Sequence, residues 1–183
     1  SENKLTIISL NINSLNKHND NFLVFINSMN KLPDIIVLTE TRNNVNEILN
    51  HDYDKYSYYI NYPIDNKCGG VAILVKKGIK HKLVKHKEIK STAIENLIVE
   101  LSTSSGSHFI SGIYKHPSVK LKDFTSILVK HIKSIPVKST LTLTGDFNID
   151  LSKIHDDIQI KNYEDKLKAL DEDFQTTIVI GMI

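Results

Sequence analysis

The sequence predicts an α/β fold, because segments typical of buried strands alternate with segments typical of amphipathic helices. Residues 5–11 and 34–40 are short, apolar and rich in β-branched side chains, which indicates two buried strands. Between them, a helical spacing of apolar residues predicts a helix that begins at Asn19 or Asp20 and ends before Pro33. This strand–helix–strand order indicates sheets covered by helices.

The middle of the chain predicts an antiparallel meander. Four strand-like segments are separated by turn sequences that contain glycine, serine and threonine. These segments are residues 56–60, 71–76, 94–101 and 109–114. Strands that follow one another along the chain in this way commonly form one antiparallel sheet.

The last third of the chain returns to alternating elements. Residues 121–132 place apolar side chains on one helical face, and residues 139–144 have the composition of a strand. Apolar residues over 160–174 recur at spacings of three and four, which predicts a long helix. One more strand is expected to begin at Thr177.

Length and composition exclude several classes of protein. The 183 residues, of which 40% are hydrophobic, suit a single domain with one core. The single cysteine, Cys68, excludes an internal disulfide and a cysteine-based zinc site, and it suits a reducing compartment. No apolar run approaches the roughly 20 residues that a membrane helix needs. We therefore expect a protein inside the cell, in the nucleus or the cytoplasm, and not in a membrane.

Polar side chains follow three of the predicted buried strands. Asn11 and Asn13 end the first strand, Glu40 ends the second, and Asp146 and Asn148 follow a later one. Strand ends in a layered fold can converge on one cleft. A carboxylate there can hold Mg²⁺ while a second carboxylate orients a water. Turn or cap residues are the alternative interpretation of each position taken alone.

Five short motifs occur in order along the chain. They are Ser9–Leu15, Pro33–Arg42, Gly69–Val75, Gly112–Pro117 and Gly145–Asn148. This order resembles the endonuclease/exonuclease/phosphatase family, and the first and third motifs look most like the endonuclease domains of non-LTR (LINE-type) retrotransposons. The resemblance implies a DNase I-like fold over residues 1–183, which is a two-layer β-sandwich flanked by helices.

The resemblance also implies a Mg²⁺-dependent endonuclease that nicks DNA by phosphodiester hydrolysis and leaves a 3′-hydroxyl. Glu40 would be the main ligand of Mg²⁺, or of Mn²⁺ in its place, and Asn11 would share the metal site. Tyr114 would donate a hydrogen bond to the phosphate. Asp146 would activate the attacking water, and Asn148 would hold the phosphoryl oxygens. These groups supply the positioned water and the charge neutralisation that in-line attack needs.

Four further residues lie next to these motifs and are expected to contact substrate. They are Asn13, Arg42, His116 and Ser118. Members of the family carry two further motifs, an aspartate after a late apolar strand and a terminal Ser-Asp-His. Neither motif follows Asn148 in this sequence. The chain is therefore expected to lack the last strands of the domain, with impaired cleavage and an uncovered sheet edge that favours self-association.

The same residues are compatible with other functions. One alternative is a catalytically inactive remnant that binds nucleic acid or a protein. A phosphatase acting on a nucleotide or a lipid headgroup is disfavoured by the retrotransposon-like opening from Leu10 to Asn13.

Two compositional clusters also have two interpretations each. Seven lysines between Lys76 and Lys90 would either contact a phosphate backbone or protect an edge strand, and we favour the second. Five tyrosines between Tyr53 and Tyr62 indicate packing within a sheet, with base stacking as the alternative.

Overall fold

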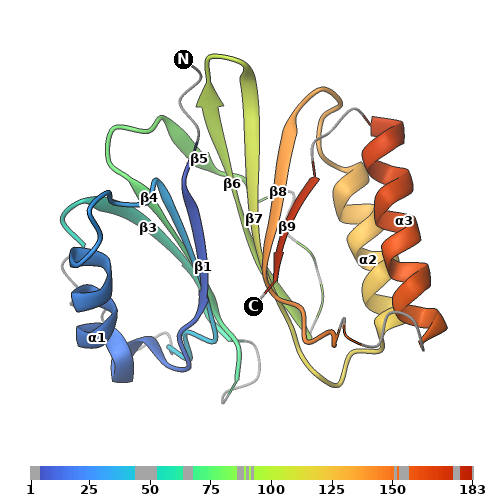
Figure 1. Ribbon diagram of the computed structural model, residues 1–183, viewed down its shortest axis with the longest axis horizontal. Coiled ribbons are helices and arrows are strands. Elements are labelled where there is room, and N and C mark those ends of the chain that lie inside the picture. The colour runs from blue at the N-terminus through green and yellow to red at the C-terminus, as the bar shows by residue number, and fades with distance from the viewer. Residues whose placement is uncertain are drawn as a thin grey trace.

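Two β-sheets packed face to face form the centre of the molecule (Figure 1). The computed structural model describes residues 5–43, 53–63, 68–85, 89, 91, 93–150, 152, 157–174 and 178–182. One helix lies on the outer face of the first sheet, and two helices lie on the outer face of the second (Figure 1). The predicted α/β sandwich of two sheets with flanking helices is confirmed.

The first sheet has the strand order β1-β2-β4-β3. Its strands are β1 (Ile7–Asn11), β2 (Ile35–Thr39), β3 (Tyr56–Asn61) and β4 (Val71–Lys76). Strands β1 and β2 are parallel, and the other two pairs are antiparallel. The helix α1 (Leu15–Asn27) covers this sheet.

The second sheet has the order β5-β6-β7-β8-β9. Its strands are β5 (His81–Leu83), β6 (Ile94–Thr103), β7 (Gly106–Lys115), β8 (Thr140–Asp146) and β9 (Ile178–Met182). Strand β8 runs parallel to both β7 and β9. The helices α2 (Leu121–Lys133) and α3 (Ile158–Phe174) cover this sheet. The last predicted strand is confirmed as β9. It pairs with the side of β8 that faces away from β7.

The core follows from the alternation of side chains along each strand. In β2, Ile35 and Val37 face the second sheet, whereas Ile36 and Leu38 pack under α1. Burial on both faces explains why this strand is a continuous apolar run. Gly112 lets the two sheets approach closely, because a Cβ there would lie 2.8 Å from Cγ1 of Val37.

Two predictions about local structure are wrong. The first helix begins at Leu15 rather than at Asn19 or Asp20, because the Ser14 hydroxyl accepts a hydrogen bond from the Lys17 amide. Asn19 lies buried inside the helix. The predicted meander is also divided, since β3 and β4 join the first sheet while β5, β6 and β7 form part of the second.

Two members of the tyrosine cluster, Tyr53 and Tyr56, are buried, whereas Tyr58 is 41% exposed. The ring of Tyr53 contacts Phe22 edge to face, and its hydroxyl donates a hydrogen bond to Asn19. The hydroxyl of Tyr56 donates to the carbonyl of Pro33. These contacts tie β3 and the residues before it to α1 and to the turn that follows it. None of the helices in the described ranges is long and apolar enough to cross a membrane.

Candidate active site

Parallel pairing brings the predicted polar residues to one edge of each sheet. In the first sheet Asn11 is in register with Thr39, so Asn11 and the adjacent Glu40 leave the sheet together. In the second sheet Tyr114 is in register with Asp146. Because the sheets pack face to face, the two edges meet (Figure 1).

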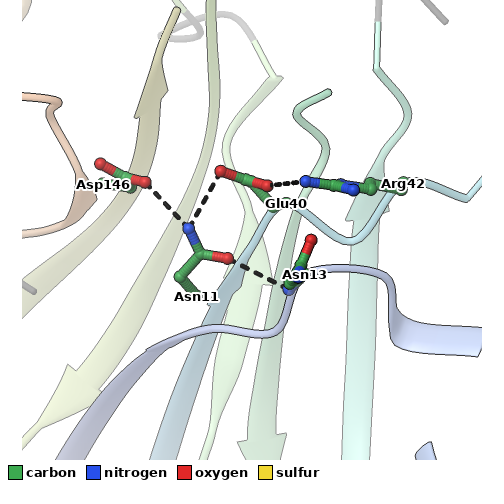
Figure 2. Close-up of polar contacts among 5 residues, drawn as sticks. All are labelled: Asn11, Asn13, Glu40, Arg42 and Asp146. Carbon is green, nitrogen blue, oxygen red and sulfur yellow. Dashed lines mark hydrogen bonds and ion pairs between the residues drawn. The ribbon is translucent and has the colours of Figure 1, made fainter. Parts of the chain in front are cut away.

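The Asn11 side chain joins the two edges. Its Nδ2 atom donates hydrogen bonds of 3.0 Å to Oε1 of Glu40 and 3.0 Å to Oδ2 of Asp146 (Figure 2). Its Oδ1 atom accepts from the backbone N–H of Asn13 at 3.1 Å, which fixes the amide in this orientation. One amide group therefore separates two carboxylates that come from different sheets and would otherwise repel each other.

Glu40 has a second partner. Its Oε2 atom forms an ion pair with the guanidinium of Arg42 (Figure 2). The side chains of Glu40 and Arg42 are 16% and 35% exposed, so a ligand can reach this pair from solvent. Asn11 is exposed as well, whereas Asp146 is buried.

The backbone around these residues is strained. Of six non-glycine residues with positive φ in the described part of the chain, five belong to the site or its flanks. They are Asn13, Ser14, Glu40, Arg42 and Asn148, with φ between 47° and 87°. Each such conformation costs about 1–3 kcal/mol and persists where the surroundings enforce it, often at functional sites.

Hydrogen bonds between loops hold this backbone. The carbonyls of Glu40 and Thr41 accept from the amides of Ser14 and Leu15, each at 2.8 Å. The amide of Arg42 donates to the carbonyl of Gly69 at 3.0 Å. The start of α1, the end of β2 and the turn before β4 therefore fix one another.

Tyr114 lies on the inner face of the second sheet, beneath the carboxylates. It is 3% exposed. Burial, together with the nearby Glu40, Cys68, Asp146 and Glu95, raises the pKa of Tyr114 to about 12. The hydroxyl thus stays protonated and can donate a hydrogen bond at neutral pH.

Asn148 forms hydrogen bonds to the last residues of both β7 and β8. Its backbone N–H donates to Oδ1 of Asp146 at 3.0 Å, and its Nδ2 donates to the carbonyl of Lys115 at 2.7 Å. Burial lowers the pKa of Lys115, and the charge of Asp146 offsets part of that effect. Asp146 and Asn148 are therefore held as a unit at the end of β8.

Among the described residues, two predicted substrate contacts flank this cluster without a hydrogen bond to its carboxylates. His116 and Ser118 sit in the turn after β7, and their side chains bond to each other at 2.7 Å. In the parts of the chain that the structure describes, their hydrogen bonds do not reach the carboxylates of Glu40 or Asp146.

The first lysines of the lysine-rich segment lie at the other end of the sandwich. Strand β4 starts beside Thr39 near the site and ends at Lys76, whose ammonium pairs with Asp34 at 3.5 Å. The edge strand β5 follows, and its Lys82 pairs with Glu100 at 2.9 Å. Lys82 therefore lies on an edge strand, as the favoured interpretation expects, whereas Lys76 ends an inner strand.

Sequence analysis missed one acidic residue near the site. Glu95 lies in β6, is 6% exposed, and accepts a hydrogen bond from the backbone N–H of Gly70. The signal was the polar pair Glu95-Asn96 next to the apolar run Leu97–Val99 of the same strand. A buried charge in such a strand needs a partner, and the partner here is a loop of the site.

The oxygen atoms of the site determine which metal ion it can bind. Within the described ranges, no group of three or more His, Cys, Asp or Glu side chains is placed to hold a metal ion. The oxygen atoms available as metal ligands belong to the carboxylates of Glu40 and Asp146 and the amide of Asn11. This set fits Mg²⁺, which commonly binds through one or two carboxylates and keeps several waters.

A two-sheet α/β sandwich that gathers carboxylates, amides and a tyrosine at its strand ends defines the class of protein. The chain belongs to the endonuclease/exonuclease/phosphatase family, whose sequence profile matches residues 8–157. The sequence matches no curated protein significantly.

Solved structures share the fold at low identity. The endonuclease domain of TRAS1, a telomere-specific non-LTR retrotransposon, superposes with a TM-score of 0.66 at 12% identity, over 91% of this chain and 72% of that domain. An AP endonuclease from Archaeoglobus fulgidus gives 0.66 at 15% identity, over 91% and 71%. D. rerio TDP2 complexed with single-strand DNA product gives 0.58 at 16% identity, over 89% and 66%.

Proposed function

We propose that the chain is a Mg²⁺-dependent phosphodiesterase of the retrotransposon type, which nicks DNA. The observation that carries the proposal is the Asn11 amide, which lies 3.0 Å from a carboxylate of each sheet. Two carboxylates with different surroundings, next to a protonated tyrosine, form a set that can bind a cation and activate a water. Mn²⁺ offers the same preference for oxygen ligands and would serve in its place.

Each residue of the site has a role in this proposal. Glu40 would hold the cation, which would supply charge neutralisation at the phosphate. Asp146 accepts the proton of the attacking water. Asn148 and the Tyr114 hydroxyl donate hydrogen bonds to the phosphoryl oxygens as charge develops on them. Asn11 holds the two carboxylates in place through its amide hydrogens. As the water oxygen bonds to phosphorus, the bond from phosphorus to the 3′ oxygen breaks, and this oxygen takes a proton from solvent to become the 3′-hydroxyl.

Residues on the rim of the site would bind the DNA strand. Arg42 can exchange its contact with Glu40 for a phosphate once a cation neutralises that carboxylate. Asn13, His116 and Ser118 flank the site and offer further donors. The complex of D. rerio TDP2 with DNA product supports DNA as the substrate class. Activity on DNA would place the protein in the nucleus or the cytoplasm.

A catalytically inactive module that binds nucleic acid is the second candidate. The observation that favours it concerns histidine: in the described residues, no histidine side chain hydrogen-bonds to Asn11, Glu40 or Asp146. General acid–base catalysis by histidine typically contributes about 10²–10⁴-fold to rate. Without it, a site of this kind would bind the cation and the strand but cleave slowly.

A plasmid assay separates the two candidates. Supercoiled DNA is incubated with the protein and Mg²⁺, beside the variants Glu40→Ala and Glu100→Ala. Glu100 is the matched control, because its side chain is 18% exposed and is paired with a lysine at the opposite end of the sandwich. Nicking that is lost only in Glu40→Ala supports the nuclease. Absence of nicking, with Mg²⁺ still raising the melting temperature of the unmodified chain, supports the inactive module.

A further inference from the structure

Glu95 is a buried acid that the proposed chemistry does not use. It lies in β6 between Ile94 and Asn96, which are 1% and 0% exposed. A carboxylate in such surroundings is costly unless donors are directed at it. The backbone N–H of Gly70 is one such donor, and it belongs to the turn that precedes β4.

The turn packs directly against this carboxylate. Gly69 and Gly70 have φ values of +102° and +86°, a conformation that glycine adopts readily. A Cβ at Gly69 would lie 2.7 Å from both Oε1 and Oε2 of Glu95. The carboxylate therefore occupies the space that any other side chain at Gly69 would need.

The same turn holds the backbone that follows Glu40. The carbonyl of Gly69 accepts from the amide of Arg42 at 3.0 Å, and the carbonyl of Gly70 accepts from the amide of Thr41 at 3.3 Å. Glu40 itself has a φ of +51°, a conformation that its surroundings must enforce. Glu95 is thus connected to Glu40 through one turn and two hydrogen bonds between loops.

We propose that Glu95 is a positioning residue, which holds the Gly69–Gly70 turn and, through it, sets the direction in which Glu40 presents its carboxylate to a divalent cation. This inference rests on the proposed role of Glu40 as a metal ligand. Loss of groups that orient a metal ligand typically weakens metal affinity by about 10–100-fold. The role requires a hydrogen-bond acceptor at the right distance from Gly70, and the negative charge is secondary.

Two variants separate distance from charge. Glu95→Asp keeps the charge but withdraws the carboxylate by one methylene from Gly70. Glu95→Gln keeps the length and leaves a carbonyl oxygen that can accept the same hydrogen bond. Glu100→Asp is the control, because Glu100 lies in the same strand and binds Lys82 and Ser107 away from the site.

The measurements are the Mg²⁺ dissociation constant by titration calorimetry and the hydrogen exchange of the Thr41 and Arg42 amides without metal. We expect Glu95→Asp to weaken Mg²⁺ binding about tenfold or more and to speed exchange at both amides. Glu95→Gln should stay within about threefold of the unmodified chain, and Glu100→Asp should change neither quantity.

Unchanged affinity and exchange in Glu95→Asp would overturn the proposal, and so would an equal loss in Glu95→Gln. If the unmodified chain binds no Mg²⁺, the proposed function fails instead. The exchange rates of Thr41 and Arg42 then decide by themselves whether Glu95 holds the loop.

Discussion

Replacing Gly145 with alanine tests how strictly the backbone presents Asp146. Gly145 is the penultimate residue of β8 and has a φ of +141°. A Cβ there would lie 1.9 Å from the carbonyl oxygen of Ile113 and 2.9 Å from its nitrogen and carbonyl carbon. All three are backbone atoms of the paired strand β7, so no side chain can turn aside to relieve the contact.

The structure sets the size of the expected effect. Contacts of a Cβ below 3.0 Å are essentially never seen, so β8 must move by about an ångström away from β7. Overpacking costs about 1–3 kcal/mol, and a side chain in this backbone conformation costs about 1–3 kcal/mol more. We therefore expect Gly145→Ala to lower the free energy of unfolding by about 2–6 kcal/mol, out of a typical 5–15 kcal/mol.

Gly78→Ala separates the two contributions. Gly78 also has a positive φ, +96°, but a Cβ there would meet nothing within 4 Å. This control carries the conformational cost without the clash, so the difference between the variants isolates the contact with Ile113. Urea unfolding followed by circular dichroism measures both. The reasoning is refuted if the two alanine variants have unfolding free energies within about 0.5 kcal/mol of each other, which is less than overpacking usually costs.

Three further predictions concern tyrosine and basic side chains. Tyr114→Phe should lower the nicking rate about 10²-fold with an unchanged melting temperature, because it removes one donor to the developing charge; an unchanged rate would contradict the role. Burial raises the pKa of Tyr114 and of Tyr56 from 10.0 to about 12, so the unfolded chain loses these protons first and stability should fall as pH rises from 10 toward 12. A melting temperature that stays level over that range, followed by circular dichroism, would count against it. Substituting glutamine at both Lys77 and Lys80 should leave DNA affinity, measured by fluorescence anisotropy, near that of the unmodified chain, whereas Arg42→Gln should weaken it; the reverse order would place the DNA at the far end of the sandwich.

The sequence predicted best where one local pattern decided the structure. Residues 71–76 form a continuous apolar run, and the observed strand β4 has the same bounds because burial on both faces requires such a run. Asn11, Glu40 and Asp146 were predicted as a group because strand ends converge in layered folds, and their side chains are in hydrogen-bond contact.

Prediction failed where contacts between distant segments decided the structure. The start of α1 is set by the Ser14 cap together with hydrogen bonds from the Ser14 and Leu15 amides to the carbonyls of Glu40 and Thr41, and the sequence near Ser14 does not encode these two long-range contacts. The strands from Tyr56 to Lys115 divide between two sheets, and the sequence of a single strand does not specify which sheet it joins. The environment of Glu95 likewise depends on a glycine turn 25 residues away along the chain.

The most direct test of the central claim is a double-mutant cycle on the nicking rate. The variants are Glu40→Gln, Asp146→Asn and the two combined, compared at one Mg²⁺ concentration. If both carboxylates serve one site, the combined variant should be no slower than the slower single variant, because residues that act as a unit are strongly non-additive. Rate losses that multiply would show two independent contributions and contradict the single site joined by Asn11.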